Sequence, residues 1–339
     1  MAAITPLNRR EALWLGSGAA LALPLAGCGK PAPKETDINV VMTAGLSGLT
    51  VHEVARAQGF FTQMDVNPKV LQVSDGGKCV AALLSGAAKL CAFSGFNQLI
   101  PAIEKGAAVK ILAGALNLPT LAMYSARADI RSVKDLEGKT LGIGAPGSVL
   151  HQMTTLLLQK KGVDVSTVRF RNVGGNADVL KAVIAKTIDA GPGDVDIWEQ
   201  QAALGIHALE DGLLWKEIPE YTNQATYASD KAIREDRDLL VRTLAAYAKA
   251  YRFISGPDSR DAFIKARETV SSAKETGQAQ TQWTWIQQNQ PYANDLRLSD
   301  ERINFIQKLN MEFKIQKRLL PISELADASL ASDAVKMLG

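Results

Sequence analysis

The sequence predicts an α/β fold: two doubly wound lobes joined by a hinge, with a helical carboxyl-terminal tail. From Ile38 onward, short apolar segments alternate with glycine-rich turns and amphipathic stretches, the order typical of β-α-β units. Residues 131–147 open a second series of the same kind, and from Glu235 onward the pattern becomes helical. The residues of this tail that are spaced for one buried face are Leu239, Leu240, Leu244, Tyr247 and Tyr251.

Residues 1–27 have the features of an export signal rather than of a folded segment. Arg9 and Arg10 precede an apolar run from Ala12 to Leu25, which is shorter than the roughly 20 residues that a membrane-spanning helix needs. Small residues then lead to Cys28, a pattern that resembles a bacterial lipoprotein signal with Cys28 as lipid acceptor. A plain secretory signal and a twin-arginine signal are the alternatives.

The composition predicts one globular body behind a tether at residues 28–37. The chain is 47% hydrophobic and 22% charged, with no second apolar run of spanning length. The signal carries Arg9, Arg10 and Glu11, so its removal changes the net charge from +3 to 3 − 1 = +2. Lys and Arg are scattered among acidic residues without a basic stripe, so we expect no nucleic-acid partner.

The first series of units gives four strands and three helices. We expect strands at 38–42, 66–73, 90–93 and 109–113, and helices at about 50–58, at 78–84 and before Gly106. Thr50 and Glu53 have the spacing of a capping box, which predicts a helix that starts at Thr50. Cys79 and Cys91 are expected to be buried free thiols, with a disulfide in an oxidising compartment as the alternative.

The second series begins with a strand at 121–124. Further strands are expected at 141–143 and 168–173, with helices from Ser148 and over 177–186. Residues 188–190 then lead into Gly-Pro-Gly-Asp at 191–194, and the candidate turn that follows is Asp194 to Trp198.

One motif in this series invites a different interpretation. Gly142, Gly144 and Gly147 satisfy G-x-G-x-x-G, and Asp164 follows at about the distance of a ribose-binding acid. However, Pro-Gly-Ser at 146–148 is typical of a turn that leads to a helix N-cap, whereas a dinucleotide site needs its third glycine inside the helix. We therefore expect no nicotinamide and no other cofactor.

Candidate ligand-binding residues follow from where open α/β sheets bind ligands. Strand-to-helix turns meet at the carboxyl edge of the strands, where helix amino termini offer unpaired N–H groups to an anion. The candidates in these turns are Leu46, Ser47, Gly48, Gly76, Gly77, Ser94, Phe96, Asn97, Asn117, Gly147, Ser148, Gly175, Asn176, Asp194 and Trp198. Most of them are small and neutral, which favours amide and hydroxyl contacts, while Phe96 and Trp198 offer aromatic contact. The alternatives are structural: glycines that only form turns, Ser148 as an N-cap, Asn117 and Asn176 as turn formers, and Trp198 in the core.

The three histidines give no sign of a metal site. His52, His151 and His207 lie far apart without paired ligand spacing. No catalytic arrangement of residues stands out either.

Seven short segments follow one another through both series. They are Glu-Val-Ala-Arg-Ala-Gln-Gly-Phe-Phe at 53–61, Ala-Leu-Leu-Ser-Gly at 82–86, Lys-Gly-Ala-Ala-Val-Lys at 105–110, Ser-Val-Lys-Asp-Leu-Glu-Gly-Lys-Thr-Leu-Gly at 132–142, Gly-Ser at 147–148, Lys-Gly-Val-Asp at 161–164 and Thr-Ile-Asp-Ala at 187–190. Their order resembles that of the periplasmic binding proteins of nitrate, sulfonate and taurine ABC transporters, from about Ile38 to Gly205. Two departures stand out: the acidic residue that the family usually has soon after Ser85-Gly86 is replaced by Lys89 or lost, and Glu199-Gln200 replaces a Glu-Pro pair.

The resemblance implies a type II periplasmic-binding-protein-like clamshell. Residues 38–120 and 225–339 would form lobe 1 with the tail, and residues 121–224 lobe 2. It further implies a monomeric receptor, in the periplasm or at the outer side of the inner membrane and lipid-anchored at Cys28. Such a receptor binds a small organic anion, of sulfonate or carboxylate type, between its lobes and delivers it to an ABC permease with its ATPase.

Two alternatives have the same fold: a receptor for aromatic or pyrimidine-type compounds, and a sensing or scaffold lipoprotein. Thiamine-biosynthesis proteins of similar fold carry a cysteine-rich iron motif. This chain has only Cys79 and Cys91 besides Cys28, so we expect no enzyme.

Overall fold

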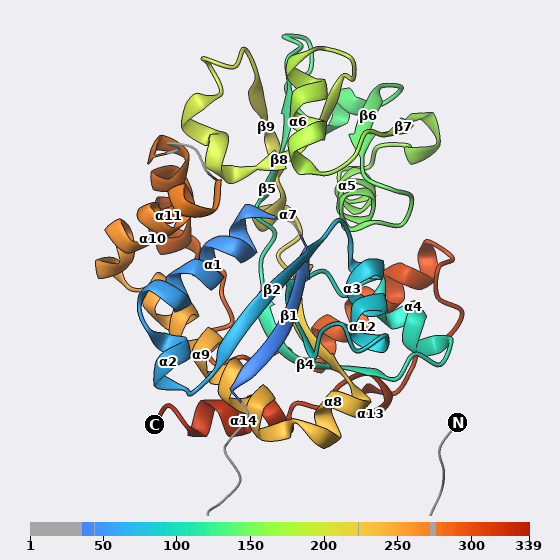
Figure 1. Ribbon diagram of the computed structural model, residues 1–339. Helices are drawn as coiled ribbons and strands as arrows, with labels where there is room; N and C mark the ends of the chain where they lie inside the picture. Colours follow the sequence, from blue (N-terminus) through green and yellow to red (C-terminus); the bar gives the residue numbers. More distant parts are fainter. Residues whose placement is uncertain (1–35, 44, 223, 272–275) are drawn as a thin grey trace, which may run out of the picture. The chain divides into compact units, whose positions relative to one another are not determined.

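The computed structural model describes residues 36–43, 45–222, 224–271 and 276–339 (Figure 1). The predicted export signal, Cys28 and all but the end of the tether lie outside these residues. The described part contains two five-stranded sheets with the strand orders β2-β1-β3-β10-β4 and β7-β6-β8-β5-β9. We call the first sheet with the helices packed on it lobe 1, and the second sheet with its helices lobe 2. Two α/β lobes with a helical tail are the predicted fold class, which is confirmed.

The sheet of lobe 1 combines parallel strands with one strand that returns from lobe 2. Its strands are β1 (Asp37–Thr43), β2 (Asn67–Val73), β3 (Leu90–Ser94), β4 (Val109–Leu116) and β10 (Gln224–Ser229). β1 pairs in parallel with β2 and β3, as the alternating pattern predicts. β10 pairs antiparallel with both β3 and β4, so the returning strand lies inside the sheet. The connecting helices are α1 (Leu46–Ala57), α2 (Phe60–Gln63), α3 (Gly76–Leu84) and α4 (Leu99–Glu104).

The predicted start of α1 is wrong by four residues. Gly45, in an extended conformation, is the N-cap, and the helix begins at Leu46. Thr50 lies inside the helix, where its hydroxyl donates to the Leu46 carbonyl at 2.7 Å, and Glu53 accepts from Arg56 instead of capping. A Thr-x-x-Glu spacing one turn into the helix therefore imitates a capping box.

Lobe 2 repeats the same plan, again with one strand, β5, that runs against the others. Its strands are β5 (Leu121–Ser125), β6 (Thr140–Ile143), β7 (Arg169–Asn172), β8 (Ala190–Asp194) and β9 (His207–Leu213). Its helices are η1 (Val133–Leu136), α5 (Val149–Lys160), η2 (Val165–Thr167), α6 (Asn176–Ile184), η3 (Val195–Gln200) and α7 (Leu214–Glu217). β6 is parallel to β7 and β8, whereas β5 is antiparallel to β8 and β9. Ser148 caps α5 as predicted.

The Gly-Pro-Gly-Asp segment forms a central strand, although glycine and proline are more typical of turns. A Cβ atom on Gly191 would lie 2.4 Å from Val179 of α6, and one on Gly193 would lie 3.0 Å from the Tyr124 ring. The side chains of Val179 and Tyr124 thus pack directly on the backbone of β8. These glycines mark close packing on a buried strand rather than a change of direction.

The tail is helical and completes lobe 1. Its helices are α8 (Asp230–Glu235), α9 (Arg237–Ser255), η4 (Pro257–Ser259), α10 (Arg260–Ser271), α11 (Thr276–Asn289), α12 (Asp300–Glu312), α13 (Ile322–Leu325) and α14 (Ser329–Lys336). The five residues predicted to form one buried face are all buried on α9, which packs against α1 and α14. Single β-bridges join β4 to Ala326 and to Tyr292 of the tail. None of the helices in the described ranges is long and apolar enough to span a membrane.

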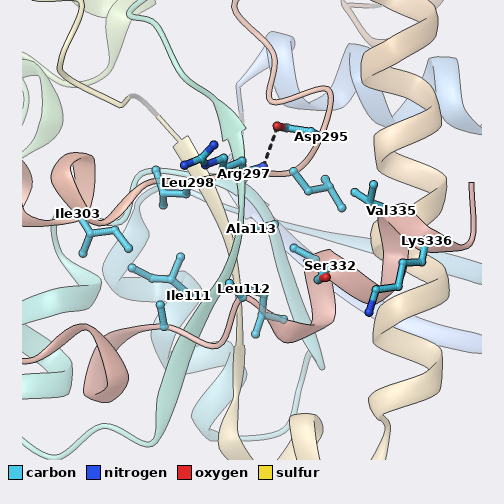
Figure 2. Close-up of a pocket in the computed structure, with 14 residues that line it drawn as sticks. Ile111, Leu112, Ala113, Asp295, Arg297, Leu298, Ile303, Ser332, Val335 and Lys336 are labelled. Carbon is cyan, nitrogen blue, oxygen red and sulfur yellow. Dashed lines mark hydrogen bonds between the residues drawn. The ribbon is translucent and has the colours of Figure 1, made fainter.

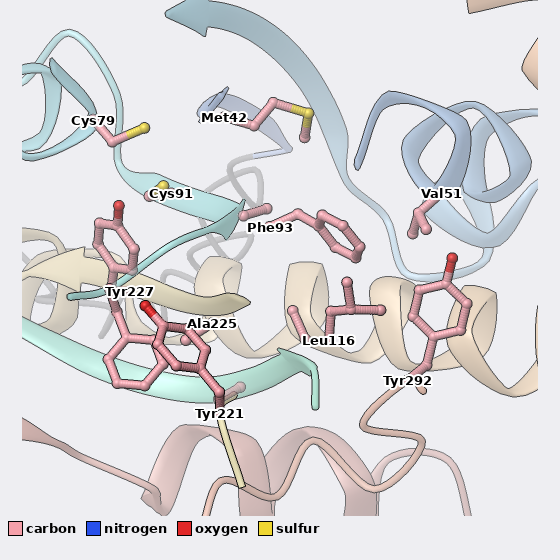
Figure 3. Close-up of a cluster of buried hydrophobic side chains, with 14 of the residues drawn as sticks. Met42, Val51, Cys79, Cys91, Phe93, Leu116, Tyr221, Ala225, Tyr227 and Tyr292 are labelled. Atoms are coloured by element: carbon pink, nitrogen blue, oxygen red, sulfur yellow. The ribbon is translucent and has the colours of Figure 1, made fainter. Parts of the chain in front are cut away.

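The two cysteines lie in the core of lobe 1 as free thiols, as predicted. Figure 3 shows Cys79 of α3, Cys91 of β3 and the Tyr227 hydroxyl of β10 gathered together. The Cys79 thiol donates to the Ser94 hydroxyl at 3.6 Å. Burial raises the pKa of Cys91, so this thiol stays protonated and packs as an apolar group.

Candidate functional site

The structure brings most of the predicted lobe 1 residues to the carboxyl ends of three adjacent parallel strands. Leu46, Ser47 and Gly48 form the first turn of α1 after β1, Gly76 and Gly77 open α3 after β2, and Ser94, Phe96 and Asn97 end and follow β3. The Gly77 N–H donates to the Gln98 side chain at 3.0 Å, which joins the second and third turns. Phe96 is buried, so its ring is part of the core.

The lobe 2 candidates occupy the corresponding positions in the other sheet. Gly147 and Ser148 precede α5 after β6, Gly175 and Asn176 open α6 after β7, and Asp194 and Trp198 lie at the end of β8 and in η3. Asn117 is different, because it lies between β4 and β5, where the chain crosses from lobe 1 to lobe 2.

A buried ring of amide side chains connects the two lobes. Asn97 of lobe 1 donates through Nδ2 to the Gly147 carbonyl at 2.9 Å and to Gln152 Oε1 at 3.2 Å. Gln152, on α5, donates to Asn310 Oδ1 at 2.7 Å, and Asn310 Nδ2 donates to the Asn97 carbonyl at 2.8 Å. The Tyr221 hydroxyl also donates to Gln152, at 3.0 Å. Asn97 and Gly147 are among the predicted ligand-binding residues, whereas Gln152, Asn310 and Tyr221 are not.

The predicted anion-binding N–H groups beside this ring already have acceptors. The Gly147 N–H donates to His151 Nδ1 at 2.9 Å, and the Ser148 N–H donates to the Ala145 carbonyl at 2.9 Å. His151 lies between the rings of Phe170 and Phe313, at centroid distances of 4.8 and 5.0 Å. Burial lowers the pKa of His151, which favours the neutral ring that accepts from Gly147.

A second network between the lobes contains a buried ion pair. Arg267 of α10 donates to Asp196 Oδ2 of lobe 2 at 2.5 Å and to Gln282 Oε1 of α11 at 2.7 Å. Gln282 in turn donates to the Ser47 hydroxyl at 3.0 Å. Arg267 is 2% exposed and Asp196 is 7% exposed, so both charges are removed from water. We call this the Asp196–Arg267 pair.

Asp194 adds a second carboxylate beside this pair. Asn176 Nδ2 lies 3.2 Å from each of its two carboxylate oxygens. Burial, and then the nearby Asp196 charge, raise the pKa of Asp194 to about 7. A carboxyl group that changes charge near neutral pH at a boundary between lobes is a typical feature of a functional site.

Aromatic side chains surround the same region. Trp198 packs edge-on against Trp215, with ring centroids 6.3 Å apart, and Trp215 packs edge-on against Trp285 of α11 at 5.5 Å. Trp198 is half-buried, so it remains a candidate for ligand contact, as the sequence predicts.

Two pockets in the described part of the chain lie away from most of the predicted residues. A cavity of about 360 Å³ is lined by β4, the segment before α12, and α14, with Ile111, Arg297 and Val335 among its walls (Figure 2). A shallower groove of about 230 Å³ includes His151, Phe170 and Phe313, next to the amide ring.

The histidines do not form a ligand set. His52 Nδ1 is 2.9 Å from the Tyr247 hydroxyl, and His207 Nε2 is 2.7 Å from the Ile130 carbonyl. Over the described ranges, no three His, Cys, Asp or Glu side chains are grouped so that they could hold a metal ion.

Comparison with known proteins gives one family match and many structural matches. The family model described as NMT1/THI5 like matches residues 49–259, which is more than half of the chain. No curated protein sequence matches the chain.

Three solved structures illustrate the structural similarity. The periplasmic aliphatic sulphonate binding protein SsuA from Escherichia coli is 16% identical, with a TM-score of 0.68, over 87% of this chain and 92% of that chain. The periplasmic nitrate-binding protein NrtA from Synechocystis PCC 6803 is 12% identical, with a TM-score of 0.68, over 89% of both chains. A Candida albicans protein said to have the generic periplasmic binding protein fold is 13% identical, with a TM-score of 0.65, over 89% of this chain and 95% of that chain.

Proposed function

Because the chain belongs to the NMT1/THI5-like family, we propose that it is an extracytoplasmic solute receptor that binds a small molecule between its lobes. The observation that carries this proposal is the contact between strand-end turns of the two lobes, where Asn97 donates to the Gly147 carbonyl. The carboxyl ends of strands from both sheets thus face each other. Open α/β sheets bind ligands at these strand ends. Closure around a ligand requires only that the ligand binds the closed form more tightly.

A small organic anion is the first candidate ligand. The solved structures of similar fold include proteins named as sulphonate-binding and nitrate-binding. Arg267 supplies a positive charge at the boundary between the lobes. The residues proposed to contact the ligand are those of the strand-end turns, with Ser47, Asn97, Asn176, Asp194 and Trp198 as the side chains that offer polar or aromatic contacts.

A receptor for aromatic or pyrimidine-type compounds is the second candidate. Asp194 accepts hydrogen bonds, and Asn176 beside it offers both a donor and an acceptor, which suits a ring with N–H groups. The half-buried Trp198 supplies an aromatic surface for stacking.

Export and anchoring complete the proposal. We place the protein in the periplasm, held to the inner membrane by a lipid on Cys28, with an ABC permease and its ATPase as partners. Ligand delivery makes and breaks no bond in the ligand, so the protein is not an enzyme in this proposal. A sensing or scaffold lipoprotein would have the same fold and anchor.

A thermal-shift screen of the protein without residues 1–28 tests the proposal. The panel contains sulfonates, nitrate, aromatic carboxylates, pyrimidines and nucleotides, because a ligand that binds the native state raises the melting temperature. Any hit is repeated with Asn97→Ala, which removes a contact between the lobes, and with Lys308→Gln on an exposed face of α12 as the control. A shift that Asn97→Ala weakens and Lys308→Gln leaves intact supports binding between the lobes. No shift with any class argues against a receptor for these solutes.

A further inference from the structure

Arg302 contacts both chain segments that connect the two lobes. The first crossover, residues 117–120, leads from β4 of lobe 1 to β5 of lobe 2. The second crossover, residues 218–222, leads from α7 of lobe 2 back towards β10 of lobe 1. The two sheets share no strand, and these two segments are the chain connections between them. Any movement of one lobe relative to the other must therefore bend both segments.

One nitrogen atom of Arg302 makes all three contacts. Its Nη1 donates to the Asn117 carbonyl of the first crossover at 2.6 Å. The same atom lies 3.2 Å from the Pro219 carbonyl and 3.0 Å from the Thr222 hydroxyl, at either end of the second crossover. Hydrogen bonds from a guanidinium are charge-assisted and stronger than those between neutral groups.

Arg302 is itself fixed to lobe 1. It lies in the first turn of α12, where its N–H donates to Ser299, the N-cap. The segment before this helix is bound to β4 of lobe 1, because the Gly114 N–H donates to the Leu296 carbonyl at 2.9 Å. The first crossover is held from its other side as well, because the Asn117 N–H donates to the Pro291 carbonyl at 2.7 Å. Arg302 therefore binds both crossovers to lobe 1 at adjacent positions.

We propose that Arg302 is the positioning residue of the hinge, holding both crossovers at one point so that lobe 2 turns about a single axis. This rests on the proposed function, in which the lobes open and close around a ligand. Without Arg302 the two crossovers move independently, so lobe 2 gains orientations that the ligand must then restrict. A lysine keeps the charge, but its flexible stem does not hold the donor nitrogen in one place as the rigid guanidinium does.

Hydrogen exchange on the ligand-free full chain tests this directly. In Arg302→Met, amides of both crossovers are expected to exchange about tenfold faster or more, the effect of losing a charge-assisted hydrogen bond. Arg302→Lys should restore part of the protection. The control is Arg297→Gln, an exposed arginine five residues earlier, which should change neither crossover.

Several outcomes would overturn the proposal. Faster exchange in only one crossover, or an equal increase throughout lobe 1, would show that Arg302 stabilises one loop or the lobe as a whole. If Arg302→Met does not fold, Thr222→Val removes a single acceptor and should speed exchange in the second crossover alone; unchanged exchange there refutes the proposal. Because no ligand is used, a failed ligand screen refutes the receptor function and leaves this result standing.

Discussion

The Asp196–Arg267 pair should contribute strongly to the contact between the lobes. Asp196 belongs to lobe 2 and Arg267 to the tail on lobe 1, and their side chains are 10% and 2% exposed. Removing one partner of a buried ion pair typically costs about 3 to 5 kcal/mol, because the charge that remains loses its opposite neighbour in a place shielded from water. We therefore expect Asp196→Asn and Arg267→Met each to lower stability by about 3 kcal/mol or more.

The double variant distinguishes a coupled pair from two independent residues. The double variant removes both charges, so neither stays buried without its opposite neighbour, and Asp196→Asn with Arg267→Met should cost clearly less than the two single changes together. Urea unfolding monitored by circular dichroism gives the three free energies. Arg260→Gln breaks an exposed ion pair with Asp261 at the start of the same helix and should change stability by less than about 1 kcal/mol.

The same variants should also favour separation of the lobes. The pair forms only when the lobes touch. Losing about 3 kcal/mol of this contact therefore lowers the ratio of closed to open protein by about 100-fold. Small-angle scattering should then show a larger radius of gyration for Asp196→Asn than for Arg260→Gln. Additive single and double variants, or an Asp196→Asn that behaves like Arg260→Gln, would refute this account of the pair.

Three further predictions concern stability. Gly142→Ala should destabilise by about 1 to 3 kcal/mol in urea unfolding, because its Cβ would lie 2.4 Å from Ile188, whereas Gly277→Ala, with its nearest atom at 3.8 Å, should not. Burial lowers the pKa of His52 to about 4, so stability should fall as pH drops from 6.5 towards 4, and His52→Gln should flatten that part of the pH profile. Burial raises the pKa of Asp194 to about 7, so its contribution to stability should be lost as pH rises from about 4 to 7, and Asp194→Asn should remove this loss.

Apolar runs and glycine turns were enough to predict the two lobes, because buried parallel strands are continuous apolar segments. They gave no strand over β8, where glycine and proline form a central strand. There the backbone is covered by Val179 and Tyr124, and no local pattern reveals which side chains from elsewhere will press on a strand. The predicted start of α1 was wrong because Thr50 does not cap the helix. Its hydroxyl donates instead to a carbonyl within the same helix.

The strand-end turns were predictable, but their partners from the tail were not. Arg267 binds Asp196 of lobe 2, and Asn310 binds Asn97 of lobe 1. In each case the two partners are more than 70 residues apart in the sequence. A weak signal was present. Arg267 follows the buried Phe263 by four residues, and Asn310 follows the buried Ile306 by four, which places a polar group on the apolar face of each helix. A polar residue in a core position needs a partner, so this pattern indicates a buried network.

The charges at the boundary between the lobes bear on the choice of ligand. Gly147 and Ser148 use their N–H groups inside lobe 2, whereas Arg267 supplies a positive charge at the boundary between the lobes. Asp196 already neutralises Arg267, and Asp194 adds a negative charge once pH exceeds about 7. An anionic ligand should therefore bind less tightly as pH rises through 7, whereas a ligand that donates N–H groups to Asp194 should bind more tightly. The sign of the pH dependence of the dissociation constant thus separates the two ligand classes, and Asp194→Asn should abolish it in either case.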